Sequence, residues 1–130
     1  MAAPNTGPFN VLLLGTKTDG TVTGVSADES TSQAMQLFGL NAVIYLQSLG
    51  TTSSGVITLE EAHWFDDEMP YGTSSTATWS TITTINASSF TGGAQLAYHL
   101  PSPVAYRYFR VRVSTAIGGG GTIAARLYAT

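Results

Sequence analysis

The sequence predicts a single all-β domain, an antiparallel β-sandwich or jelly-roll-like fold, and three observations support this prediction. Runs of about five to nine β-branched and aromatic residues recur along the chain, each closed by Gly, Ser, Thr, Asn or Asp. No stretch shows the apolar period of an amphipathic helix. The 130 residues of the chain are also the length of one ordinary domain.

The apolar runs define nine predicted strands. In chain order these are residues 9–15, 21–26, 33–38, 42–49, 55–62, 77–86, 95–100, 106–115 and 122–129. Together they assign residues 9–130 to the sandwich domain.

Two turn sequences lie between these strands. Asp19-Gly20 is a two-residue hairpin signal, because both positions tolerate positive φ. Four consecutive glycines, 118–121, predict a second hairpin that joins the last two strands.

Strand 106–115 alternates in character, so its two faces can be assigned. Its two sets of side chains are Phe109, Val111 and Val113 on one face and Tyr108, Arg110 and Arg112 on the other. We expect the valine face to enter the core and the arginine face to stay outside it.

The first eight residues have no core-facing pattern, and Pro4, Gly7 and Pro8 punctuate them. They predict an extended N-terminal arm covering residues 1–8. Pro4, Asn5 and Pro8 are candidate contacts to a partner, because such an arm can lie along a neighbouring molecule.

Composition excludes several classes of protein. Charged residues make up 10% of the chain, against about 25% in a typical domain. The net charge of −3 provides no basic surface for a phosphate backbone, so nucleic acid is not an expected partner. The chain has no cysteine, which excludes disulfides and thiolate metal sites and fits assembly in a reducing cytoplasm. We expect no membrane span, because the apolar run 9–14 is far too short.

The sequence predicts no enzyme, no metal and no cofactor. Its densest ionisable group comprises Glu60, Glu61, His63, Asp66, Asp67 and Glu68. A carboxylate pair or a metal site could be built from such residues, but Glu60 and Glu61 point to opposite faces of a strand, and the acids lack the spacing of a calcium loop. The simplest interpretation is a solvated acidic loop.

Three arginines, Arg107, Arg110 and Arg112, lie within one strand beside tyrosines. They could contact acidic side chains of a neighbouring subunit, or stack on bases or sugars. They could equally belong to an ordinary outer sheet face with cross-strand ion pairs. We keep them as candidate partner contacts.

Three segments of the second half carry a resemblance to a known family. They are GVITLEEA at 55–62, ATWSTI at 77–82 and YRYFRVRVS at 106–114, the last followed by the glycines and a final strand. This pattern resembles small β-sandwich virion proteins of tailed phages, in which a tyrosine- and arginine-bearing strand pairs through a glycine-rich turn with the final strand. The compact Asn-Asp-Gly turn of that family is replaced here by the longer segment 66–76, so no role of the turn carries over.

The resemblance implies a capsid decoration (cement) protein, or a head or tail accessory domain, with no catalytic residues. Its implied partner is the major capsid protein, and its implied location is the outer surface of the virion. A homotrimer is expected, since such proteins commonly cap local three-fold positions of a capsid.

A carbohydrate-binding or receptor-binding domain of a phage tail is the alternative from another class. Trp64, Tyr71 and Trp79 flank the longest predicted loop and could form a platform on which a sugar ring stacks, with Asp66 and Asp67 accepting hydrogen bonds from hydroxyls. The plainer interpretation is that both tryptophans lie in the core.

Overall fold

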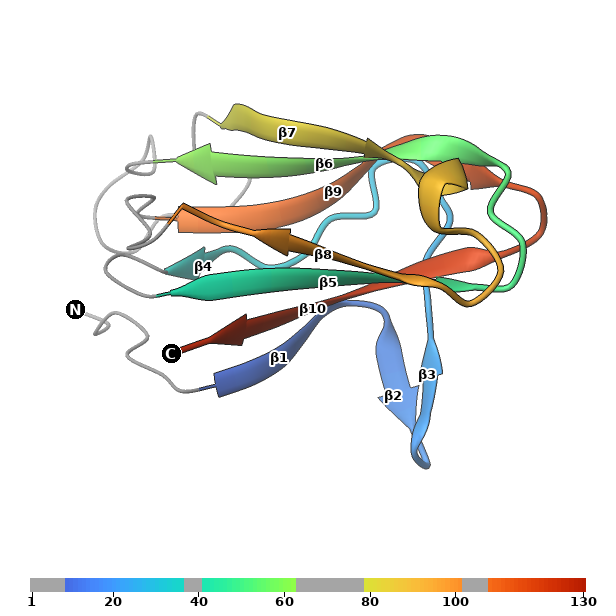
Figure 1. Ribbon diagram of the computed structural model, residues 1–130, viewed down its shortest axis with the longest axis horizontal. Coiled ribbons are helices and arrows are strands. Elements are labelled where there is room, and N and C mark those ends of the chain that lie inside the picture. Colours follow the sequence, from blue (N-terminus) through green and yellow to red (C-terminus); the bar gives the residue numbers. More distant parts are fainter. Residues whose placement is uncertain (1–8, 37–40, 63–78, 102–107) are drawn as a thin grey trace.

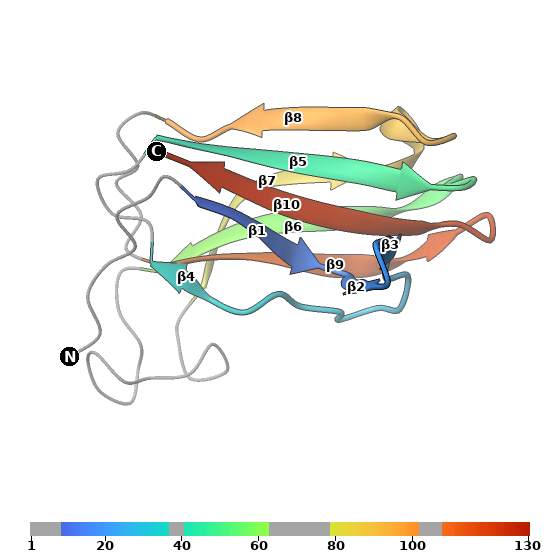
Figure 2. The ribbon, with the colours of Figure 1, turned by 90° about the horizontal axis from the view of Figure 1, so that it is seen from below.

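A computed structural model describes residues 9–36, 41–62, 79–101 and 108–130. Two four-stranded antiparallel sheets pack against each other, and a short hairpin projects away from them (Figures 1 and 2). The all-β sandwich prediction is confirmed. The proposed arm, residues 1–8, lies outside the described residues.

Each sheet is built from strands distant in sequence. The first sheet has the order β1 (Phe9–Leu14), β10 (Thr122–Ala129), β5 (Ala42–Leu49) and β8 (Gln95–His99). The second has the order β4 (Met35–Gln36), β9 (Tyr108–Gly118), β6 (Ser54–Ala62) and β7 (Ser80–Asn86). The remaining elements are the hairpin strands β2 (Thr16–Thr18) and β3 (Thr21–Thr23) and a 3₁₀ turn, η1 (Ala87–Phe90).

The strand order is that of a jelly roll. If the eight sandwich strands are counted in chain order, leaving out the hairpin, the two sheets run 1-8-3-6 and 2-7-4-5. This is the order produced when a long antiparallel ribbon, pairing strand 1 with 8, 2 with 7, 3 with 6 and 4 with 5, is wrapped into two sheets. The jelly-roll prediction therefore holds at the level of topology.

The glycine-rich turn is where the prediction fails. We expected β9 and β10 to pair as a hairpin, but β9 pairs with β6 and β4, while β10 pairs with β5 and β1. Both edges of each strand are already occupied, so glycines 118–121 carry the chain from one sheet to the other. Gly119 has a φ of +100°, and a Cβ there would lie 2.9 Å from the carbonyl oxygen of Thr51, so the crossing requires glycine.

The other turn prediction is confirmed. Asp19 and Gly20 join β2 to β3 with φ values of 51° and 80°, the signs required by a type I′ turn. The hairpin belongs to neither sheet and projects sideways from the edge of the sandwich next to β1 (Figure 1).

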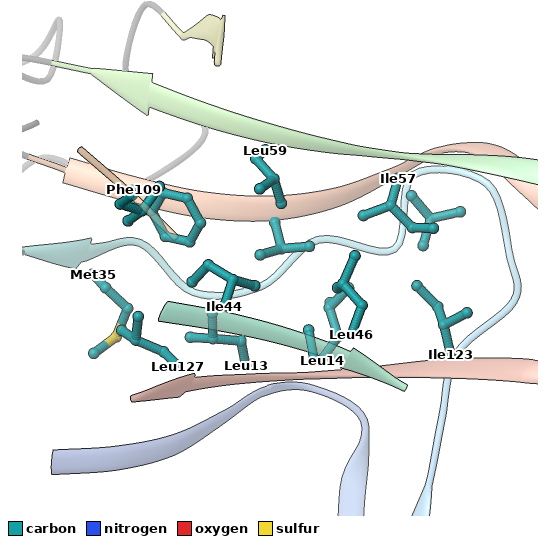
Figure 3. Close-up of a cluster of buried hydrophobic side chains, with 14 of the residues drawn as sticks. Leu13, Leu14, Met35, Ile44, Leu46, Ile57, Leu59, Phe109, Ile123 and Leu127 are labelled. Atoms are coloured by element: carbon teal, nitrogen blue, oxygen red, sulfur yellow. The ribbon is translucent and has the colours of Figure 1, made fainter. Parts of the chain in front are cut away.

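The core lies between the inner faces of the two sheets (Figure 3). As strand alternation predicted, Phe109, Val111 and Val113 are fully buried, and Arg110 and Arg112 lie on the outer face. The central strands of both sheets supply the other large side chains with no exposed surface: Ile44, Leu46, Ile57, Leu59, Ile123 and Leu127.

The predicted strand bounds hold best where alternation is regular. Strands 42–49 and 122–129 are reproduced without change as β5 and β10. The predicted strand 33–38 is reduced to Met35–Gln36 within the described residues. Before it, the chain runs irregularly beside β9, where the amides of Glu29 and Ser32 donate hydrogen bonds to the carbonyls of Val113 and Val111. These bonds cover the free edge of β9 without forming a regular strand.

Replacing Phe109 by Ala should lower the free energy of unfolding by about 3–5 kcal/mol, because a fully buried aromatic ring would leave a cavity between the sheets. Tyr128→Ala is the matched control. Its ring is 46% exposed, so we expect a loss of about 1 kcal/mol. Urea denaturation followed by tryptophan fluorescence measures both, and equal losses would show that Phe109 does not occupy the core.

Candidate binding surfaces

The outer face of the second sheet carries a buried charge network. Glu60 of β6 lies opposite Arg110 of β9 in the ladder, and only 5% of the glutamate is exposed. The neighbouring Glu61 is opposite Phe109 and so belongs to the other face, as alternation predicted.

Two arginines neutralise Glu60. Arg110 donates from Nε to Glu60 Oε1 at 2.8 Å. Arg112 donates from Nε to Oε1 at 3.2 Å and from Nη2 to Oε2 at 3.3 Å, and its Nη1 reaches Glu29 Oε1 at 2.8 Å. Hydrogen bonding to Glu60 is the main cause of the raised pKa of Arg112.

A carboxylate at this depth is stable only when it is paired and hydrogen-bonded, which explains why two guanidinium groups converge on it. The four charges of Glu60, Glu29, Arg110 and Arg112 sum to zero. The expectation that Glu60 belongs to a solvated acidic loop is therefore wrong. Its partners, 50 and 52 residues away in sequence, bury it.

The geometry favours the interpretation of this face as an outer sheet surface with cross-strand ion pairs. Arg110 and Arg112 are both engaged with Glu60 within the chain, and 15% and 22% of their side chains are exposed. Their role as contacts to a partner stays a prediction.

Trp79 lies beside the same network. The guanidinium carbon of Arg110 is 4.3 Å from the centre of the indole ring, a cation–π contact. The ring also packs against the small cluster formed by Ala62 and Tyr108. One face of Trp79 is thus occupied by Arg110 and cannot stack on a sugar while that contact lasts.

Several candidate residues lie outside the described ranges. The partner-contact candidates among them are Pro4, Asn5, Pro8 and Arg107, and the loop candidates are Trp64, Asp66, Asp67 and Tyr71. Among the described residues, no group of three or more His, Asp or Glu side chains could hold a metal ion.

The outer face of the first sheet is different in kind. We call it the tyrosine face. Within the described ranges, the exposed large hydrophobic residues are Tyr45, at 39%, and Tyr128, at 46%, and both lie on this face. Two rows of register partners cross all four strands of this sheet. The rows are Leu12–Arg126–Tyr45–Ala97 and Asn10–Tyr128–Val43–His99.

A shallow cavity of about 280 Å³ adjoins the second row. The lining residues come from the ends of β5, β8 and β10: Asn41, Ala42, Val43, His99, Leu100, Tyr128 and Thr130. The hairpin root marks the opposite end of the face. There Ala124, although it points outward, is 3% exposed, and a Cβ on Gly15 would lie 3.6 Å from its Cβ.

The sequence contains a signal for the tyrosine face that we did not use. In both β5 and β10 a tyrosine alternates with buried aliphatic residues: Ile44 and Leu46 flank Tyr45, while Leu127 and Ala129 flank Tyr128. Alternation alone places these rings outside. That they are neighbours on one face depends on the pairing of β5 with β10, which the sequence does not indicate.

Comparison with known protein families and with curated proteins finds no match to this chain. Within the described residues, no helix has the length and apolar character needed to cross a membrane.

Replacing Glu60 by Gln should lower the free energy of unfolding by about 2–4 kcal/mol, since two partly buried guanidinium groups would lose their counter-charge. Glu29→Gln removes a carboxylate from the same network, but that side chain is 65% exposed, so the loss should stay below about 1 kcal/mol. Urea denaturation of both variants tests this, and equal small losses would contradict a central role for Glu60.

Proposed function

We propose that this chain is a structural protein of a tailed-phage virion, a decoration protein that binds the outer surface of the capsid and stabilises it. The observation that carries the proposal is the sequence pattern of residues 55–62, 77–82 and 106–114, which resembles virion proteins of this type. One feature departs from that pattern: β9 does not pair with the final strand, because the glycine turn after it carries the chain to the other sheet.

The architecture is compatible with such a role. Jelly rolls are common in viral capsids, and the antiparallel sandwich is rigid because every strand is held by a ladder of backbone hydrogen bonds. The charge network of Glu60 is neutral, and the chain has few charged residues, so copies packed on a lattice repel one another weakly.

The proposed arm has a defined point of departure. Phe9 pairs with Ala129, so the described chain begins at the end of the first sheet where β10 finishes. The proposed arm is joined to the sandwich at this end, where the backbones of Asn41 and Thr130 are hydrogen-bonded to each other.

The alternative is a carbohydrate-binding or receptor-binding domain of the tail. The contact between Arg110 and Trp79 argues against the predicted loop platform, because Arg110 covers one face of the indole ring. The exposed tyrosines of the first sheet, Tyr45 and Tyr128, give this alternative a different surface.

Antibodies raised against the purified chain should label the heads of intact phage particles in immunogold electron microscopy. Gold on the tail would replace the capsid proposal by the tail alternative. Absence of the chain from gradient-purified particles, measured by mass spectrometry, would overturn both.

The arm should matter for attachment and not for folding. Deleting residues 1–8 should lower the amount of protein that co-sediments with capsids while leaving the urea midpoint unchanged. Undiminished co-sedimentation would remove the arm from the interface.

The intact protein should be a trimer. Light scattering after size-exclusion chromatography should give three times the 13.6-kDa mass of the chain, about 41 kDa. A mass of one chain would contradict the trimer.

A further inference from the structure

The tyrosine face has an unbalanced charge. Its four strands, β1, β5, β8 and β10, contain no Asp or Glu, and their one permanent cation is Arg126. Every ion pair between described residues lies on the second sheet, and Arg126 takes part in none. In a chain of net charge −3, this face is suited to an anionic group.

Arg126 is surrounded by apolar and aromatic neighbours. Leu12 and Tyr45 are its register partners on either side, and Tyr128 is two residues further along the same face. The arginine as a whole is half-buried. A carboxylate that reached its guanidinium could form a bidentate pair of parallel hydrogen bonds.

The part of the face around Arg126 has the size of a small ligand. Four strands spaced about 4.8 Å apart and two rows about 7 Å apart give a flat area of roughly 250 Å², which matches two or three sugar rings.

The chemistry of the face also fits a sugar. Tyr45 and Tyr128 are diagonal neighbours across β5 and β10, and their exposed rings offer apolar faces to the C–H side of a pyranose. His99 and Asn10 end the second row and can exchange hydrogen bonds with hydroxyl groups. The adjoining cavity of about 280 Å³ gives depth for one ring at the Tyr128 end.

We propose that the tyrosine face binds an acidic saccharide, a pyranose bearing a carboxylate, with the carboxylate on Arg126 and the ring against Tyr45 and Tyr128. This inference is independent of where the chain sits in a virion, because it rests on the first sheet alone. It differs from the loop platform predicted around Trp64, Tyr71 and Trp79. The described member of that set, Trp79, lies against Arg110 of the second sheet.

Titration of ¹⁵N-labelled protein with trigalacturonate tests the proposal. We expect chemical-shift changes in the amides of β1, β5, β8 and β10 around the two rows, and weaker binding, by about tenfold, of the neutral galactose trisaccharide. No binding at millimolar trigalacturonate, or shifts confined to the second sheet, would overturn it.

Variants separate the two parts of the site. Arg126→Gln should weaken trigalacturonate about tenfold and leave the neutral trisaccharide unchanged, whereas Tyr128→Ala should weaken both. Lys17→Gln is the matched control, because it removes the same charge from the exposed hairpin and should change neither affinity. Thermal unfolding of each variant confirms that it is folded.

A short polyglutamate peptide distinguishes a saccharide site from a surface for acidic protein segments. It should bind far more weakly than trigalacturonate, since it lacks a ring to stack on the tyrosines. Equal affinity for the peptide, or an equal effect of Lys17→Gln and Arg126→Gln, would refute a sugar-specific site.

Discussion

Burial of the two inner sheet faces against each other decides where every other side chain of the sandwich can go. Because residues alternate across a strand, filling the inner face with Ile44, Leu127 and Phe109 sends their sequence neighbours outward. The ladders then bring together outward residues from distant parts of the chain. The charge network on one sheet and the tyrosines on the other are both products of that arrangement.

The two outer faces treat charge in opposite ways. On the second sheet the carboxylate of Glu60 is enclosed by two guanidinium groups, so its charge is balanced within the chain and is not available for recognition. On the first sheet Arg126 has no carboxylate beside it among the described residues. We therefore expect binding specificity on the first sheet, where the charge of Arg126 is not balanced by a described carboxylate, and rigidity on the second sheet, where the charge of Glu60 is balanced.

Local patterns in the sequence predicted the strands well but did not predict which strands pair with each other. Alternation gave β5 and β10 their bounds, and Asp19-Gly20 gave the β2–β3 hairpin, because both signals lie within a few residues. The pairing of β9 with β6 joins segments 50 residues apart, and no local property of either strand specifies it. The burial of Glu60 was missed for the same reason. β4 begins at Met35, later than predicted, because the chain before it is held beside β9 by irregular backbone bonds.

The glycine turn at 118–121 joins the last strand of one sheet to the last strand of the other, and this affects the order in which strands can pair during synthesis. The last two strands each take a central position, β9 between β4 and β6 and β10 between β1 and β5. Until residues 108–130 have left the ribosome, both sheets lack an inner member, and β1 and β4 have no strand to pair with. Before then β5 can pair with β8, and β6 with β7, but β1 and β4 must wait. The two sheets are therefore completed late, when β9 and β10 enter them.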